Sequence, residues 1–250
     1  MLVSFPRIAL SVLLLLTVTA SADVVRVGVA ANFVAALTAL QPDFERRSGH
    51  RLQISAGSTG LLYAQIVNGA PFDVFLAADQ QRPALLVESG RALADSRLTY
   101  AVGRLVLFSA DKKPSADTLG GEVGRLAIAN PKLAPYGRAA ADVLQRFGLN
   151  ERLGGRIALS QNVAAAYAAA ATRNVDLAFV ALAHVRTREV PPGGGYWLVP
   201  AAWHTPIRQD AVRLIRSNGN VAAGAFMEYL ADPATRARLQ RFGYEFPAAP

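Results

Sequence analysis

Small polar residues recur where the predicted strands pass into the predicted helices. These residues are Asn32, Ser58, Thr59, Tyr136 and Asn162, and Gly137 and Val163 directly follow the last two. At each such junction the first backbone N–H groups of the helix lack an intrahelical partner, and the helix dipole adds about half a positive charge. Several junctions gathered at one place would hold a small dianion without lysine or arginine. Taken singly, each residue also fits an ordinary helix cap.

Signatures of catalysis are missing from the sequence. It contains no phosphate-binding G-x-x-x-x-G-K-[ST] loop, no dinucleotide-binding G-x-G-x-x-G after a strand, no G-x-S-x-G and no H-E-x-x-H. Asp73 and Asp79 flank a predicted strand and could serve as the paired acids of a secreted hydrolase. We favour capping or structural roles for both carboxylates. No catalytic residue is therefore predicted.

Composition narrows the classes of protein further. The chain of 250 residues has no cysteine, which excludes disulfide scaffolds, cysteine-ligated metals and thiol catalysis. Its three histidines are too few and too scattered to indicate a histidine-ligated metal site. The net charge is +8, but the basic residues are spread along the chain and not concentrated between aromatics. We therefore expect no nucleic-acid partner. A positive surface instead favours encounters with small anions.

The first 22 residues are typical of a secretory signal. Arg7 precedes an apolar run of about 13 residues, Ile8–Ala20, and the small residues Ala20-Ser21-Ala22 follow. The run is shorter than the roughly 20 residues that a membrane-spanning helix needs. We expect an exported protein that begins near Asp23.

Alternating strands and helices predict an α/β fold. The first series of predicted elements comprises strand Val24–Ala30, helix Asn32–Arg47 (kinked or divided at Pro42), strand Arg51–Ala56, a helix through Leu62–Val67, strand Asp73–Ala78 and helix Pro83–Ser89. The second series comprises strand Arg125–Ala129, helix Gly137–Phe147, strand Arg156–Leu159, helix Val163–Thr172 and strand Leu177–Val180. This order favours doubly wound parallel sheets.

Two extended passes connect the series. They lie near residues 102 and 203, within Tyr100–Ser109 and before the predicted strand Ile207–Ile215. Two terminal helices, Val221–Leu230 and Pro233–Phe242, follow. We predict residues 23–102 with 204–250 as one lobe and residues 103–203 as the other. Ligands of open α/β sheets bind at the carboxyl ends of the strands, so the cleft between lobes is the expected site.

Five stretches of the sequence resemble one known family. They are VGVAANFVAAL (27–37), SAGSTGLLYAQIVNGAPFDVFLAADQ (55–80), IANPKLAPYGRAAADVL (128–144), SQNVAAAYAAAATRNVDLAFV (160–180) and LQRFGYEF (239–246). In these stretches the chain resembles the periplasmic molybdate-binding proteins (the ModA family), the solute receptors of molybdate ABC transporters. The resemblance runs in order through most of the chain after residue 22.

The resemblance implies a type II periplasmic binding protein fold, with two α/β lobes joined by a double-crossover hinge. It implies a bound molybdate or tungstate held by hydroxyl and backbone N–H donors. The implied contacts are Asn32 with Ala31 beside it, Thr59 with Ser58 as the alternative, Tyr136, and the backbone N–H of Val163. Some relatives carry a tyrosine where this chain has Ala181, and Tyr136 is the candidate replacement donor.

The resemblance also implies partners. They are the oxyanion and the permease of a molybdate ABC transporter, and the receptor is expected to be a monomer without a cofactor or a metal beyond the oxyanion. A receptor for another tetrahedral oxyanion, such as sulfate, is the alternative within the same class.

Overall fold

The computed structural model describes residues 23–246. The predicted signal segment, residues 1–22, lies outside the described residues. Across the described range no helix combines the length and the apolar character that crossing a membrane would require.

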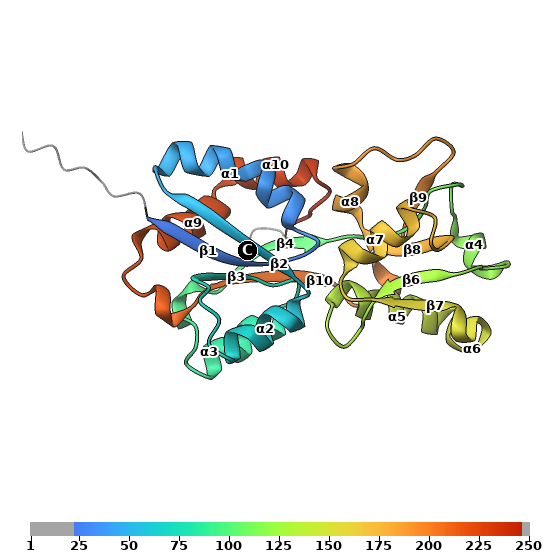
Figure 1. The fold of residues 1–250 in the computed structure, drawn as a ribbon, viewed down its shortest axis with the longest axis horizontal. Coiled ribbons are helices and arrows are strands. Elements are labelled where there is room, and N and C mark those ends of the chain that lie inside the picture. Colours follow the sequence, from blue (N-terminus) through green and yellow to red (C-terminus); the bar gives the residue numbers. More distant parts are fainter. Residues whose placement is uncertain (1–22, 247–250) are drawn as a thin grey trace, which may run out of the picture.

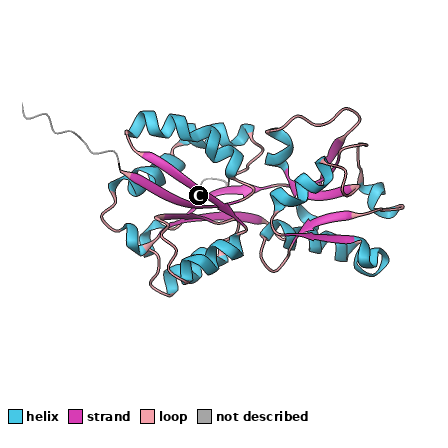
Figure 2. Cartoon of the chain, in the orientation of Figure 1, coloured by secondary structure: helices cyan, strands magenta, loops and turns pink. Residues whose placement is uncertain are grey.

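Two five-stranded sheets lie side by side along the long axis of the molecule, with helices packed around each (Figures 1 and 2). Their strand orders are β2-β1-β3-β10-β4 and β7-β6-β8-β5-β9. We call the first sheet with its helices lobe 1 and the second sheet with its helices lobe 2. The predicted architecture of two α/β lobes is confirmed.

Lobe 1 contains the first and the last elements of the chain. Its strands are β1 (Val24–Ala30), β2 (Arg51–Gly57), β3 (Val74–Leu76), β4 (Leu98–Gly103) and β10 (Ile207–Arg213), and its helices are α1 (Val34–Ser48), α2 (Thr59–Val67), α3 (Gln81–Glu88), α9 (Val221–Ala231) and α10 (Pro233–Arg241). Strands β1, β2 and β3 are parallel, whereas β10 runs antiparallel to both β3 and β4.

Alternation in the strands of lobe 1 divides its core into two layers. Val74 and Leu76 of β3 pack with the valines of β1 and with α1 and α9. Phe75 packs on the opposite face, with apolar residues of α2 and α3. Both faces of the sheet are therefore covered by helices, which explains why β3, the central strand, is apolar without interruption.

Lobe 2 repeats this construction. Its strands are β5 (Leu105–Ser109), β6 (Leu126–Ala129), β7 (Ile157–Ser160), β8 (Leu177–Ala181) and β9 (Gly195–Leu198), and its helices are α4 (Ala116–Gly120), α5 (Pro135–Arg146), α6 (Leu149–Leu153), α7 (Val163–Ala171) and α8 (Leu182–Arg186). Short 3₁₀ turns occur at Ala94–Ser96, Gly154–Arg156, Ala201–Trp203 and Ile215–Ser217.

The chain crosses between the sheets twice. The first crossing lies between β4 and β5, where a single residue, Arg104, separates a strand of lobe 1 from a strand of lobe 2. The second crossing lies between β9 and β10. The lobe 1 strands at the two crossings, β4 and β10, are neighbours in the sheet, with Gly103 opposite Ile207. Both connections therefore leave lobe 1 at the same end of adjacent strands.

Several predicted elements differ from the observed ones. Helix α1 is one continuous helix with Pro42 inside it, so the predicted division there is wrong. The predicted extended segment Tyr100–Ser109 contains parts of two strands, β4 and β5, and these belong to different sheets. Helix α8 was not predicted: its apolar residues continue those of β8, and a run of one composition carries no signal for the change from strand to helix.

Candidate functional site

A small cavity lies where the lobes meet. It is lined by Ala30, Ala31, Asn32, Ser58, Thr59, Ala78, Ala134, Pro135, Tyr136, Asn162 and Val163. All six residues predicted as contacts are in this set, although they come from four separate parts of the sequence. The cavity volume is about 10 Å³, roughly the room of one water molecule, so the lobes lie close together here.

Three helices begin at the cavity. Thr59 is the first residue of α2 in lobe 1, Val163 is the first residue of α7 in lobe 2, and Tyr136 is the second residue of α5, also in lobe 2. The N–H groups of these positions have no partner within their own helices. Their dipoles place partial positive charge at the cavity from both lobes.

The two adjacent hydroxyls in the turn before α2 differ in their partners. Ser58 is 2% exposed, and its Oγ has no hydrogen-bond partner among the described residues. Thr59 Oγ1 accepts a hydrogen bond from the Ala78 N–H at 3.0 Å, which leaves its own proton free to be donated. Both side chains can therefore donate into the cavity, and the Ser58 hydroxyl has no other partner among the described residues.

The side-chain amide of Asn32 forms its hydrogen bonds within lobe 1. Its Nδ2 donates to Gln209 Oε1 at 2.8 Å and to Tyr244 Oη at 3.3 Å. The Tyr244 hydroxyl in turn donates to the Asn32 carbonyl at 2.7 Å. Within residues 23–246 the backbone N–H of Asn32 has no protein acceptor, whereas the N–H groups of Ala31 and Phe33 on either side are both bonded. Asn32 therefore faces the cavity with its backbone donor.

Tyr136 is buried, and its hydroxyl lies away from the backbone that lines the cavity, beside Gly103 and Gln209. Burial raises the pKa of Tyr136 well above its ordinary value, and the nearby amide of Gln209 opposes this rise of the pKa only in part. The phenol consequently stays protonated at neutral pH and is available as a donor.

The described residues that line the cavity include no charged side chain. In the same part of the chain, residues 23–246, no group of three or more His, Asp or Glu side chains is arranged to hold a metal ion. The groups at the cavity that can donate are therefore neutral N–H and O–H groups.

Direct contacts hold the lobes together around the cavity. The Gly60 N–H of α2 donates to the Leu133 carbonyl of lobe 2 at 2.8 Å. The Arg82 guanidinium, paired with Asp79, donates to the Lys132 carbonyl at 3.0 Å. These bonds fix the loop before α5, and thus the start of α5, against lobe 1.

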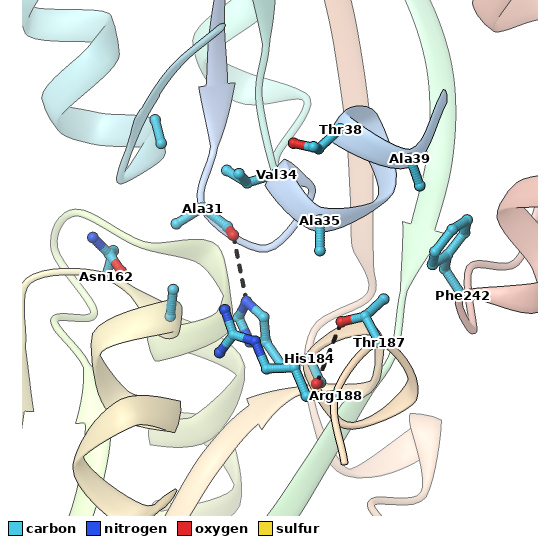
Figure 3. Close-up of a pocket in the computed structure, with 12 residues that line it drawn as sticks. Ala31, Val34, Ala35, Thr38, Ala39, Asn162, His184, Thr187, Arg188 and Phe242 are labelled. Atoms are coloured by element: carbon cyan, nitrogen blue, oxygen red, sulfur yellow. Dashed lines mark hydrogen bonds between the residues drawn. The ribbon is translucent and has the colours of Figure 1, made fainter. Parts of the chain in front are cut away.

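A wider groove of about 600 Å³ adjoins the cavity and shares Ala31 and Asn162 with it (Figure 3). His184 of α8 lies in this groove, with its Nε2 3.4 Å from the Ala31 carbonyl of lobe 1 (Figure 3). Burial lowers the pKa of His184 to about 4. The hydrogen bond to the Ala31 carbonyl opposes this lowering of the pKa, whereas the positive charge of nearby Arg188 adds to it. The imidazole is therefore neutral at pH 7.

The carboxylates considered for a hydrolase are separated and engaged. Asp73 precedes β3 and accepts a hydrogen bond from the Arg26 N–H at 2.8 Å. Asp79 follows β3 and is bonded to both the backbone and the side chain of Arg82. Carboxylates at opposite ends of one strand do not form a catalytic pair, which supports their structural interpretation.

Three residues near the site were not predicted from the sequence: Gly103, Gln209 and Tyr244. Gln209 and Tyr244 lie 177 and 212 positions from Asn32, and no local pattern marks such pairs. Ala181, where some relatives carry tyrosine, is buried at the end of β8 and does not line the cavity.

Two hinged α/β lobes with neutral donors at their junction define a solute-binding protein, and the comparisons with known proteins agree. The family described as bacterial extracellular solute-binding protein matches residues 25–245. The molybdate-binding protein ModA of Azotobacter vinelandii is 44% identical over 92% of this chain and 93% of its own length. ModA of Rhodobacter capsulatus is 39% identical over 94% of each chain. This chain belongs to the ModA family of molybdate-binding proteins.

A solved structure shares the fold. The periplasmic molybdate-binding protein of Azotobacter vinelandii superposes with a TM-score of 0.84 at 38% identity, over 89% of this chain and 99% of that one. The resemblance found in the sequence is thus confirmed at the level of family and fold.

Proposed function

We propose that this protein captures molybdate or tungstate in the cavity between its lobes and delivers the oxyanion to the permease of an ABC transporter. The observation that carries the proposal is the convergence of three helix N-termini and two hydroxyls, from both lobes, on one uncharged cavity. Family membership supports the choice of ligand, since the relatives named above are molybdate-binding proteins.

The donor set suits a fully deprotonated dianion. Charge-assisted hydrogen bonds contribute about 1.5–3 kcal/mol each, so several converging donors offset the cost of removing the anion from water. Protonated phosphate would need an acceptor for its P–OH, and the described lining side chains include no carboxylate. The site residues of the proposal are Ala31, Asn32, Ser58, Thr59, Tyr136 and Val163, and no cofactor is part of it.

The cavity can load only if the lobes separate. Its volume is too small to admit an oxyanion from solvent as it stands, and the bonds of Gly60 and Arg82 to lobe 2 must break during entry. Closure around the anion then gives the permease a shape that differs from the empty receptor. The proposal takes lobe 1 and lobe 2 as the moving bodies; they follow the predicted division into residues 23–102 with 204–250 and residues 103–203, except that Gly103 ends β4 and so belongs to lobe 1. The receptor of the proposal is an exported, periplasmic monomer that binds and does not catalyse.

A thermal-shift screen against molybdate, tungstate, sulfate and phosphate tests the proposal. A ligand that binds only the folded protein raises its melting temperature. We expect molybdate and tungstate to raise it, with calorimetry giving one saturable site. A response to sulfate alone would make the protein a sulfate receptor, and no response to any of the four anions would refute the proposed function.

A further inference from the structure

Tyr136 connects the two lobes. Its backbone belongs to the first turn of α5 and lines the cavity, and its ring packs in the core of lobe 2. Its hydroxyl reaches across to Gly103, the last residue of β4 in lobe 1, immediately before the chain crosses over. The position of this ring therefore depends on how the lobes sit relative to one another.

Because Gly103 has no side chain, the Tyr136 hydroxyl and the adjacent end of its ring can occupy the space beside it. A Cβ at this position would overlap the Tyr136 Oη, and it would lie 2.9 Å from Cζ of the ring and 2.8 Å from Nε2 of Gln209. Gly103 is paired with Ile207 in the sheet, so it is the space and not an unusual backbone conformation that calls for glycine. Any side chain here would displace the Tyr136 ring, which is stiff and enclosed.

Gln209 is oriented to meet the incoming hydroxyl. Its Oε1 accepts hydrogen bonds from Asn32 Nδ2 at 2.8 Å and from the Tyr100 hydroxyl at 3.1 Å. Both acceptor bonds turn its Nε2 toward Tyr136. Among the described residues Nε2 of Gln209 and Oη of Tyr136 each lack an aligned partner, and both are buried. Small adjustments would let them satisfy one another, which favours the seated position of the ring.

We propose that Gly103 is a positioning residue for the anion site: it forms a socket in lobe 1 into which the Tyr136 hydroxyl must seat before the lobes can close. The inference rests on the proposed function and deepens it. If the ring cannot seat, the start of α5 is held back, and its N–H groups no longer reach the anion together with those of α2. Asn32 is bonded to the same Gln209, so the socket and the cavity share one hydrogen-bonded frame.

Gly103→Ala in the full chain tests the socket, with Gly155→Ala as the matched control because nothing lies within 4 Å of a Cβ at Gly155. Calorimetry measures molybdate affinity, and small-angle scattering measures the compaction that molybdate causes. We expect Gly103→Ala to bind at least tenfold more weakly and to compact less, whereas the control behaves as wild type. Wild-type affinity and compaction in Gly103→Ala would overturn the inference.

A second comparison shows whether the effect of Gly103→Ala arises from its overlap with the Tyr136 hydroxyl. If Gly103→Ala alone does not fold, recovery of folding and binding when it is combined with Tyr136→Phe supports the socket, and a double variant that still fails to fold overturns the inference. Tyr136→Phe removes the overlapping oxygen, so the alanine should weaken binding less in that background than in wild type. An equal loss in both backgrounds would show that Gly103 acts elsewhere and overturn the inference. A wild-type protein that binds none of the oxyanions would overturn the proposed function itself, whatever Gly103→Ala does, and the inference with it.

Discussion

At the scale of single residues, the neighbouring hydroxyls of Ser58 and Thr59 differ in their hydrogen bonds within the protein. The Ser58 hydroxyl is buried and unpaired in the described part of the chain, whereas the Thr59 oxygen holds the Ala78 N–H. An unpaired buried hydroxyl costs stability until a ligand accepts its proton. Ser58 is therefore the residue whose removal should separate binding from folding.

Ser58→Ala should weaken molybdate binding by roughly 1–3 kcal/mol, about five- to 150-fold, because the anion loses a donor. The melting temperature of the anion-free protein should not fall, since no bond within the protein is lost. Thr59→Val is the matched comparison: it should weaken binding and also destabilise the free protein, because the Ala78 N–H loses its acceptor. Calorimetry and thermal melts measure both effects. Unchanged affinity in Ser58→Ala would remove Ser58 from the site.

From the sequence, the residues of the cavity could be recognised only by their position between a predicted strand and a predicted helix. Each polar residue between a strand and a helix was visible as a candidate, and the structure brings all six predicted positions to one cavity. The partners of each side chain were not visible. That the Asn32 amide would be held by Gln209 and Tyr244, and so present its backbone and not its side chain, depends on contacts made only after folding.

At the scale of elements, the predictions that held are those with a clear start and a clear period. The predicted helix Val163–Thr172 is α7, Val163–Ala171, and Asn162 caps it by accepting from the Ala165 N–H at 3.0 Å. Helix α8 lacked such a signal, because no polar residue separates it from β8. The helix N-termini that form the site were thus predictable, and the short helix that brings His184 to lobe 1 was not.

The cap of α7 offers a prediction that separates the stability of an element from its role at the cavity. Asn162→Asp keeps a good helix cap, so the melting temperature should not fall. It also places a negative charge at the cavity, and unit charges about 4 Å apart near a protein surface repel by about 4 kcal/mol. Molybdate affinity should therefore fall at least tenfold.

Asn220→Asp is the control for this change. Asn220 caps α9 through the Ala223 N–H at 3.2 Å, and it does not line the cavity. The same substitution there should leave both melting temperature and molybdate affinity unchanged, as measured by thermal melts and calorimetry. If the Asn162→Asp protein binds molybdate as tightly as the wild-type protein does, the N-terminus of α7 does not face the anion.

At the scale of the whole molecule, the two lobes contact one another around the cavity and again at the groove. In the second contact His184 Nε2 donates to the Ala31 carbonyl, and Nδ1 has no partner among the described residues, so a proton added at Nδ1 would have no acceptor. A protonated ring would place a buried charge beside Arg188, which also lines this groove. Protonation of His184 at low pH should therefore destabilise this contact between the lobes.

Unfolding at different pH values tests this dependence. Burial lowers the pKa of His184 to about 4, below the value of about 6.5 expected in the unfolded chain, so the unfolded state binds the proton more readily. The stabilisation is complete above pH 6.5 and is lost as the pH falls toward 4, by an amount on the order of 3 kcal/mol. His184→Gln keeps a donor for the Ala31 carbonyl and cannot titrate in this range. Denaturant unfolding without added oxyanion should show a steeper loss of stability in wild type than in His184→Gln between pH 6.5 and 4. Equal slopes in the two proteins would mean that the His184 imidazole titrates normally and does not link lobe contact to pH.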